Sequence, residues 1–362
     1  MKKITCFTSN LSGGGAEHQL VLLSNFLAEK GYDITIVTYN NIPDHYVLDN
    51  RIKRVKINVD GKPNLIKQWL ISLYFWKLKT DCIISFRADP NFILLIPMLF
   101  TKKPKIIVSE RNTTIIPNKR ESINYNYLYN RASYIVPNSY TQEGFLRKLG
   151  KKWTERVVTI TNYTDVKEYT PKGIPDNNDC ILIGVFSRIF PQKNYERFCE
   201  MLSLLKKQTT TKFKVIWYGD KKEGEFLKGS IHIHKLIKQY DIADVIEVKE
   251  AVNNVSNHMG QFHAMCLPSL YEGFSNAISE YICSGKVVLC SDVSDNHVMV
   301  HHGENGFLFN PNDISSMSGA FLDFFKLSDV QIKEMGHRSR LIAESLFNRD
   351  KFVNSYIDLI EK

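Results

Sequence analysis

The segment 268–280, PSLYEGFSNAISE, holds the residue types best suited to chemistry in this sequence. Two carboxylates, Glu272 and Glu280, lie eight positions apart and flank a glycine-containing turn that leads into a predicted helix. The N–H groups at a helix start lack partners inside the helix and can meet hydroxyl or phosphate oxygens. Here they belong to Gly273, Phe274, Ser275 and Asn276. Because carboxylates accept hydrogen bonds from paired hydroxyls, the two acids could bind the hexose and the ribose of one nucleotide sugar.

Two cations, Arg188 and Lys193, lie five positions apart in the segment SRIFPQKN, after a predicted strand and before a predicted helix. Arginine offers a planar fork of donors and lysine a point charge, so together they could straddle a diphosphate. The same charges could stabilise a diphosphate as it departs. In isolation, a solvated pair of surface charges is an equally good interpretation.

A glycine loop, SGGGAE at residues 12–17, separates the first predicted strand from the first predicted helix. Gly14 and Gly15 lack side chains, so their N–H groups can approach an anion at the positive end of that helix. The spacing differs from the G-x-G-x-x-G of dinucleotide-binding proteins, which weakens a dehydrogenase interpretation. A plain tight turn is the alternative. His18, beside the loop, is a weaker candidate for substrate contact.

The elements that must position these residues alternate between short apolar strands and amphipathic helices. This pattern predicts parallel sheets covered on both faces, in an α/β protein. The expected strands are 4–8, 34–38, 52–59, 82–86, 106–109, 134–137, 157–160, 180–186, 213–218, 245–248, 262–267 and 287–291. The expected helices are 16–30, 65–79, 141–149, 195–207, 231–240 and 276–284, with helical periodicity from 314 to 362.

A linker composition at residues 169–179, YTPKGIPDNND, interrupts this alternation. The length of 362 residues also suits two domains better than one core. We therefore expect two Rossmann-like domains, residues 1–168 and 169–345, with a final helix at 346–362 that crosses back onto the first domain. Ligands of such sheets lie beyond the carboxyl ends of the strands, so the fold predicts a two-substrate enzyme.

Charge and composition restrict the partners. Residues 1–170 contain 25 Lys and Arg against 14 Asp and Glu, a net charge of +11, whereas the remainder has 22 against 24, or −2. A basic half implies an acidic binding partner, such as anionic lipid, nucleic acid or a phosphorylated substrate. Because RNA-recognition and zinc-finger patterns are absent, nucleic acid is the least favoured of these partners. The seven scattered cysteines and the histidines at 232, 234, 301 and 302 lack metal-site spacing, so we expect no metal and no cofactor.

Taken together, these motifs resemble the GT4 family of retaining glycosyltransferases. The resemblance rests on the two acids, on Arg188 with Lys193, on the glycine loop and on the closing segment HGENGFL at 302–308, and it covers essentially the whole chain. It implies a GT-B fold, with a nucleotide sugar held mainly by the second domain and an acceptor by the first, and no metal requirement.

The resemblance also implies residue roles. Arg188 and Lys193 would hold the donor diphosphate, Glu280 the ribose hydroxyls and Glu272 the transferred sugar, with the amides of 273–276 around it. Gly14 and Gly15 would approach the diphosphate from across the cleft. Many members carry a histidine or aspartate near the reacting carbon, but here the strand ends read FRAD at 86–89 and SERN at 109–112. The catalytic base therefore stays unassigned.

The SERN variant resembles members that build bacterial surface glycans on lipid-diphosphate carriers. It suggests Arg87 or Arg111 as an anion contact and Glu110 as an acceptor-side carboxylate, with a strand-end salt bridge as the alternative. A UDP-sugar is the favoured donor, and a lipid-linked or oligosaccharide glycan is the expected acceptor.

An anionic membrane surface is a further expected partner. The predicted helix 65–79 combines Trp, Tyr and Phe with lysines, and nearby basic groups lie at 51–56, 102–105 and 147–152. Such a surface can lie in a bilayer interface, although a helix that buries these aromatics against the sheet is an equal interpretation. No apolar run reaches the length of a membrane span, so we expect a cytoplasmic protein, peripheral at the inner membrane face.

Two other functions are compatible with the same fold. A nucleotide-sugar epimerase would use the same cleft, and a non-catalytic subunit would keep the fold only to position a partner. The simultaneous presence of Arg188, Lys193, Glu272 and Glu280 argues against the second.

Overall fold

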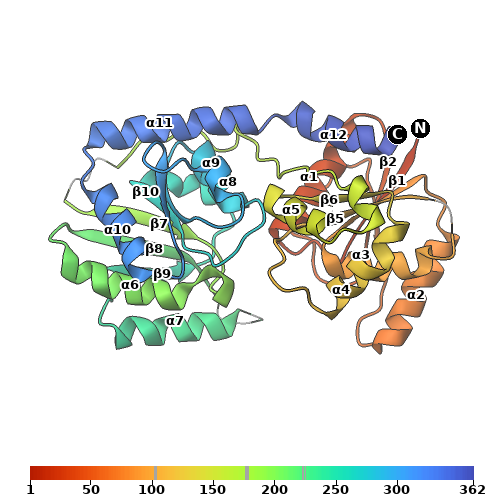
Figure 1. Ribbon diagram of the computed structural model, residues 1–362, viewed down its shortest axis with the longest axis horizontal. Helices are drawn as coiled ribbons and strands as arrows, with labels where there is room; N and C mark the ends of the chain where they lie inside the picture. Colours follow the sequence, from red (N-terminus) through yellow and green to blue (C-terminus); the bar gives the residue numbers. More distant parts are fainter. Residues whose placement is uncertain (102–103, 176–178, 222–223, 225) are drawn as a thin grey trace. The chain divides into compact units, whose positions relative to one another are not determined.

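The computed structural model describes residues 1–101, 104–175, 179–221, 224 and 226–362 (Figure 1). The chain forms two compact units. The first contains Met1–Tyr163 together with Arg349–Lys362, and the second contains Thr164–Asn348. The domain boundaries predicted after residues 168 and 345 lie within a few residues of these divisions. The predicted linker falls inside the second unit, and its positions 176–178 lie outside the described residues.

The first unit is built on a six-stranded parallel sheet in the order β3-β2-β1-β4-β5-β6. Its strands are β1 (Lys3–Thr8), β2 (Asp33–Thr38), β3 (Lys53–Lys56), β4 (Cys82–Phe86), β5 (Lys105–Glu110) and β6 (Tyr134–Pro137). Its helices are α1 (Gly15–Glu29), α2 (Asn64–Lys77), α3 (Ala88–Met98), α4 (Lys119–Asn126), α5 (Tyr140–Lys148) and α12 (Arg349–Glu361), with short 3-10 turns at Leu128–Arg131 and Lys152–Arg156. Helices α2, α3 and α4 cover one face, and α1 and α12 lie on the other (Figure 1).

The second unit repeats this plan, in the order β12-β11-β10-β7-β8-β9. Its strands are β7 (Ile181–Phe186), β8 (Phe213–Asp220), β9 (Ile246–Glu250), β10 (Ala264–Leu267), β11 (Val287–Ser291) and β12 (Gly306–Phe309). Its helices are α6 (Tyr195–Gln208), α7 (Leu227–Gln239), α8 (Asn276–Cys283), α9 (Asn296–Met299), α10 (Ile314–Phe325) and α11 (Asp329–Leu346), with 3-10 turns at Pro191–Lys193, Val255–Asn257 and Met259–Gln261. Within each unit the order is that of the Rossmann fold, so the predicted fold class is confirmed.

Several details of the secondary structure differ from the predictions, and α4 and β12 are further elements that were not predicted. The predicted strand 157–160 is wrong, because only Val157 forms an isolated bridge, to Ile135. The predicted strand 52–59 contracts to Lys53–Lys56. Helix α3 was not among the predicted helices; it contains Pro90 and Pro97, and Pro90 is tolerated because it lies in the first turn, where no intrahelical N–H is needed.

The C-terminal helix α12 belongs to the first unit. The guanidinium of Arg349 lies 4.1 Å from the ring centre of Phe26 in α1, and Phe352 stacks on Tyr163. At the other end of the helix, Lys105 Nζ donates to the carbonyls of Leu359 and Ile360, at 3.2 and 3.0 Å. Cations that meet the last carbonyls of a helix complement its dipole.

Within the second unit, α11 approaches the backbone before β11 very closely. Gly285 has φ +64°, and a Cβ placed on Gly336 of α11 would lie 2.3 Å from the Gly285 carbonyl oxygen. Both positions therefore require glycine, one for its backbone conformation and one for space.

This contact generates a stability prediction. Gly336→Ala should destabilise the second unit by roughly 1–3 kcal/mol, because the added methyl must push α11 away from the Gly285 carbonyl. Gly319→Ala in α10 is the matched control, since a Cβ there meets nothing within 4 Å. Alanine is the better helix former, so the control should gain about 0.5–1 kcal/mol. Calorimetric unfolding of both variants measures the difference, and an equal response would contradict the packing argument.

Candidate functional site

The predicted site residues of the second unit lie at one edge of its sheet. The loop 187–194 follows β7, and the segment 268–275 follows β10, so both begin at carboxyl ends of strands. Strands β7 and β10 are neighbours, and the strand order reverses between them. In open parallel sheets this topological switch point is where ligands bind.

Lys193 and Glu272 meet at this switch point. Lys193 Nζ lies 2.5 Å from Glu272 Oε1, and both side chains are largely buried, with 15% and 11% of their surface exposed. The two segments are joined beside the pair, because Gln192 accepts from the Leu270 N–H and donates to the Tyr271 carbonyl, each at 2.8 Å. The loop after β7 and the segment after β10 are thus bonded to each other next to the ion pair, which holds it in place.

Ser294, in the loop after β11, holds the backbone of Glu272. Its hydroxyl donates to the Glu272 carbonyl at 2.5 Å and accepts from the Glu272 N–H at 3.3 Å. Ser294 has φ +50°, an uncommon conformation for a residue with a side chain. Three loops at the same sheet edge therefore fix the position of one carboxylate.

Arg188 lies on the same loop as Lys193 but is exposed. Its guanidinium stacks over the ring of Phe226, 4.7 Å from the ring centre. Stacking holds the planar group by its face and leaves its N–H edge able to meet an anion. Within the described part of the chain, no carboxylate forms an ion pair with Arg188.

Glu280, four residues into α8, has partners different from those of Glu272. Burial raises its pKa to about 8, with Glu168 adding to the rise, while a hydrogen bond with Tyr169 acts in the opposite direction. Tyr169 comes from the segment that opens the second unit, and Arg340 Nη1 donates to the Tyr169 carbonyl at 2.8 Å. The structure therefore pairs Lys193 with the first acid and Tyr169 with the second.

Residues at the start of α8 stabilise the helix and are also predicted to contact the donor. Ser275 is the N-cap, and its hydroxyl accepts from the Ile278 N–H at 3.4 Å. Phe274 is buried and packs edge-on against Phe347, with ring centres 6.4 Å apart. The side chains of these two predicted donor residues thus hold the helix start, and only their backbone groups could contact a ligand.

In the first unit, the glycine loop is covered by the segment 40–46. Gly14 is the N-cap of α1, and its carbonyl accepts from the Tyr46 hydroxyl at 3.0 Å. A Cβ on Gly14 would lie 2.1 Å from Glu17 Oε2, so a side chain there would collide with that carboxylate. His18 stacks on Tyr46, and its pKa is lowered, first by burial and then by His45.

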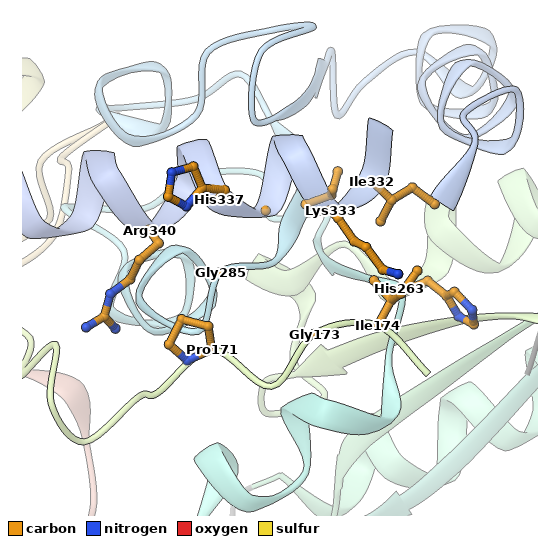
Figure 2. A pocket seen from close by; sticks show the side chains of 11 residues that line it. Pro171, Gly173, Ile174, His263, Gly285, Ile332, Lys333, His337 and Arg340 are labelled. Carbon is orange, nitrogen blue, oxygen red and sulfur yellow. The ribbon is translucent and has the colours of Figure 1, made fainter. Parts of the chain in front are cut away.

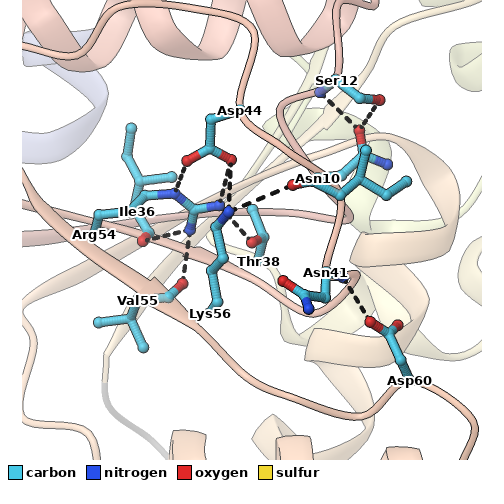
Figure 3. A network of polar contacts seen from close by, with 11 residues as sticks. Asn10, Ser12, Ile36, Thr38, Asn41, Asp44, Arg54, Val55, Lys56 and Asp60 are labelled. Atoms are coloured by element: carbon cyan, nitrogen blue, oxygen red, sulfur yellow. Dashed lines mark hydrogen bonds and ion pairs between the residues drawn. The ribbon is translucent and has the colours of Figure 1, made fainter.

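A polar network fixes that covering segment (Figure 3). Arg54 binds both carboxylate oxygens of Asp44, at 2.9 and 3.0 Å, and donates to Thr38 Oγ1 at 2.7 Å. Lys56 lies 3.4 Å from the same carboxylate. On the other side, Asn10 Oδ1 accepts from the N–H and the hydroxyl of Ser12. Two of the cations predicted to make this region basic are therefore paired within the unit.

Arg87 forms an ion pair with Glu17, with Nη1 and Oε1 2.7 Å apart. Glu17 is buried whereas the Arg87 side chain is 46% exposed, so the positive end of the pair faces outward. Arg87 also has φ +82° at the start of α3. For this residue, the salt-bridge alternative weighed from the sequence is present in the structure.

Glu110 and Arg111, at the end of β5, are engaged inside the first unit. Glu110 is buried and accepts a short hydrogen bond from the Tyr129 hydroxyl. Burial raises its pKa to about 8, and Glu121 adds to the rise. The Arg111 guanidinium lies 4.5 Å from the ring centre of Phe86, and Nη2 donates to Asn162 at 2.5 Å. Glu110 and Arg111, the two predicted acceptor-side residues, therefore bond to other residues and not to each other.

Other titratable groups have local partners. His232 lies 3.2 Å from Glu196 and His234 3.1 Å from Asp220. All seven cysteines are free, and only Cys180 is not buried. In the described ranges, no three histidine, cysteine or acidic side chains gather as metal ligands do. None of the helices in those ranges has the length and apolar character needed to cross a bilayer.

Comparison with known proteins indicates the class of enzyme. Residues 167–342, nearly all of the second unit, match the family model described as glycosyl transferases group 1. This match and the relatives named below indicate a glycosyltransferase whose second unit is similar to that family.

Relatives and solved structures agree with this assignment. An Escherichia coli UDP-Gal:alpha-D-GlcNAc-diphosphoundecaprenol alpha-1,3-galactosyltransferase is 24% identical, with 94% of each chain covered. The Campylobacter jejuni N-acetylgalactosamine-N,N'-diacetylbacillosaminyl-diphospho-undecaprenol 4-alpha-N-acetylgalactosaminyltransferase is 22% identical over 81% of each. Anabaena HepE, solved in complex with UDP and glucose, superimposes with a TM-score of 0.82 at 15% identity, over the full length of both chains. The predicted GT-B fold is confirmed, and these matches favour sugar transfer over the epimerase and the non-catalytic subunit.

Sequence reasoning missed several residues that support the candidate site. They are Gln192, Ser294, Tyr169 and Phe226, which position Lys193, Glu272, Glu280 and Arg188. Tyr169 was assigned to a linker on the composition of its neighbours. No spacing in the sequence connects it to Glu280, because the contact forms only when the chain folds.

The central ion pair can be tested by its coupling energy. Lys193→Ala and Glu272→Ala should each destabilise the second unit, because each leaves a largely buried charge without its partner. The double variant should lose less than the sum of the two, with a coupling of roughly 0.5–3 kcal/mol. The control cycle is Lys206 with Asp244, an exposed pair 2.8 Å apart in the same unit. Its coupling should stay below about 1 kcal/mol, and equal couplings in the two cycles would show that burial confers no advantage.

Proposed function

We propose that this glycosyltransferase moves a sugar from a nucleotide diphosphate sugar, with a UDP-sugar favoured, onto a lipid-linked glycan in surface polysaccharide synthesis. The observation that carries the proposal is the arrangement at the switch point of the second unit, where Lys193 meets Glu272 on loops that also carry Arg188 and lead into α8. The relatives named above transfer sugars to diphosphoundecaprenol-linked acceptors, which supports the acceptor class.

The donor would be held by groups of both charges. We assign Arg188 and Lys193 to the diphosphate, since two cations on one loop match its two anionic groups. Glu280 would accept from the ribose hydroxyls and Glu272 from a hydroxyl of the transferred sugar, with the amides of Gly273–Asn276 around it. Support comes from the position of all four side chains at loops or a helix after β7 and β10.

The reaction would retain the anomeric configuration by a front-face route. The acceptor oxygen forms its bond to the anomeric carbon while the bond from that carbon to the diphosphate oxygen breaks. The acceptor's hydroxyl proton passes to the departing phosphate oxygen, and the products are the glycoside and the nucleoside diphosphate. This route needs no protein base, which fits the absence of an assigned base in the sequence.

Charge on the leaving diphosphate would be stabilised by Arg188 and Lys193, so we propose that the enzyme works without a bound metal ion. Cations fixed in a largely buried position can supply the stabilisation that a metal gives elsewhere. Lys193 is such a cation, because 85% of its side-chain surface is covered.

The acceptor would bind to the first unit. Arg87 is the best anion contact there, since its guanidinium is half exposed while its partner Glu17 is buried. Gly14 and Gly15 would bring main-chain N–H groups to the substrate, and His18 would contact it beside Tyr46. Glu110 and Arg111 are assigned a supporting role on the acceptor side, because both are already bonded to neighbouring residues.

An anionic membrane surface would bind helix α2. Leu65, Trp69 and Trp76 lie on one stripe of this helix and are 86%, 57% and 50% exposed, whereas Ile71 and Phe75 are buried. The helix contains no acidic residue and carries two lysines, Lys67 and Lys77. Exposed aromatics with flanking lysines suit the headgroup region of an anionic bilayer. Lys102 and Lys103, predicted to add charge here, lie outside the described residues.

Donor binding is tested by thermal shift. A ligand at 100 times its dissociation constant adds about 2.7 kcal/mol of stability. Arg188→Ala and Glu280→Gln should each weaken UDP-sugar binding roughly tenfold or more, because each removes a charge-assisted hydrogen bond. Lys235→Ala, an exposed lysine of α7 in the same unit, should leave both binding and turnover unchanged. Retention of full donor affinity by both site variants would sink the proposed function.

Membrane binding is tested by sedimentation with phosphatidylglycerol or phosphatidylcholine vesicles. Leu65→Ser with Trp69→Ser should reduce binding to the anionic vesicles several-fold, because it removes exposed apolar area from α2. The matched control is Val330→Ser with Leu341→Ser on α11, residues that are 64% and 51% exposed. Equal and negligible binding of the unmodified protein to both vesicle types would reject the membrane proposal and leave the donor site untouched.

A further inference from the structure

A cavity of about 180 Å³ lies in the second unit, between α11 and the segment 171–174 (Figure 2). Figure 2 shows α11 with Lys333 and His337 along one side and Pro171, Gly173 and Ile174 along the other. None of the residues proposed to hold the donor lines it. The cavity is therefore separate from the sugar-transfer site.

Glycines create this space. Gly285 and Gly336 bring α11 against the backbone before β11, and a Cβ on Gly285 would lie 3.2 Å from Pro171. Three glycines in the lining leave a gap where side chains would otherwise interlock, and Val287 and Ile332 close its apolar part. An engineered apolar cavity of about 150 Å³ accepts a benzene ring, so this one has room for a body of that size and not for a nucleotide sugar.

The charged groups around the cavity are all basic. Lys333, His337 and Arg340 follow one another along α11, and no aspartate or glutamate is among the lining residues. Arg340 is already bonded to the carbonyls of Val166, Tyr169 and Cys283 and to Glu344. Lys333 and His337 have no hydrogen-bond or ion-pair partner in the described part of the chain, so the lysine ammonium and the imidazole ring are available to a ligand.

The wall opposite α11 is held firmly. Lys286, a buried lysine between the lining residues Gly285 and Val287 in sequence, donates to the carbonyl of Phe262 at 2.8 Å and to that of Gly173. These bonds fix the segment 171–174 to the core of the unit. A cavity whose two walls are fixed in this way is pre-formed, which lowers the entropic cost of binding.

From these observations we propose that the cavity binds a small organic anion, a carboxylate or phosphate on an apolar body about the size of a phenyl ring. The apolar body would occupy the space over Val287 and Gly285, and the anionic group would meet Lys333 and His337 at the rim. Segment 171–174 continues from Tyr169, which contacts Glu280, so the ligand would touch the chain that supports the donor-site carboxylate.

Ligand-observed NMR of the full chain with benzoate and phenyl phosphate tests this inference. Each probe should bind with a dissociation constant of roughly millimolar, as expected for a ligand of about ten non-hydrogen atoms. Benzyl alcohol and benzylammonium, which carry no anionic group, should bind at least about fivefold more weakly. Binding of benzyl alcohol as tight as that of benzoate would overturn the assignment of the anion, and the absence of saturable binding would overturn the site.

Variants locate the probe. Lys333→Ala should weaken benzoate binding about threefold or more, and Ile174→Trp should abolish it by filling the cavity. Arg338→Ala, an exposed cation on the same helix that does not line the cavity, should have no effect. An unaltered affinity in Lys333→Ala, which is exposed and should fold normally, contradicts the proposal.

Competition with UDP separates this inference from the proposed function. UDP should not displace benzoate, because the two sites share no residue. Displacement would place the probe in the donor site and reject the separate cavity. If UDP-sugars fail to bind while benzoate still does, the proposed function fails and the cavity stands.

Discussion

The parallel pairing of β7 with β10 is the constraint on which the site depends. Ile183 and Gly184 of β7 lie opposite Ala264 and Met265 of β10, although about 80 residues separate them along the chain. A Cβ on Gly184 would come within 3 Å of the side chains of Phe262 and Met265. Glycine at this position therefore leaves the space that these two side chains occupy. Because the strands are parallel, both following loops emerge at the same edge, and Lys193 can reach Glu272.

The two acids are held by different parts of the fold and have different partners. Glu272 is close to a cation that keeps its charge compensated. Burial raises the pKa of Glu280 to about 8, Glu168 adds to the rise, and a hydrogen bond with Tyr169 lowers it. Ionisation of Glu280 is therefore favoured when a ligand supplies hydrogen-bond donors to it. A group of ribose hydroxyls would do so, which makes the binding of a nucleoside and the charge of Glu280 mutually dependent.

Most of the fold could be predicted from the sequence, because buried parallel strands are short apolar runs and their spacing is regular. Candidate residues for the site could be proposed as well, since Glu272, Arg188 and Lys193 follow strand ends. Their partners could not. Phe226, Ser294 and Tyr169 reach the site from loops whose course depends on tertiary packing, and a composition typical of a linker concealed Tyr169. Likewise, nothing in SERN indicates that the glutamate faces a buried tyrosine.

The shared topology of the two units places an ion pair at the same point in each. In the second unit it joins the loop after the first strand, β7, to the segment after the fourth, β10. In the first unit Glu17 follows β1 and Arg87 follows β4, so the signs are reversed. The exposed partner in the first unit is the cation, which suits an anionic acceptor, whereas in the second both partners are largely buried and the exposed cation is Arg188. A single strand order therefore presents positive charge at both switch points, through different residues.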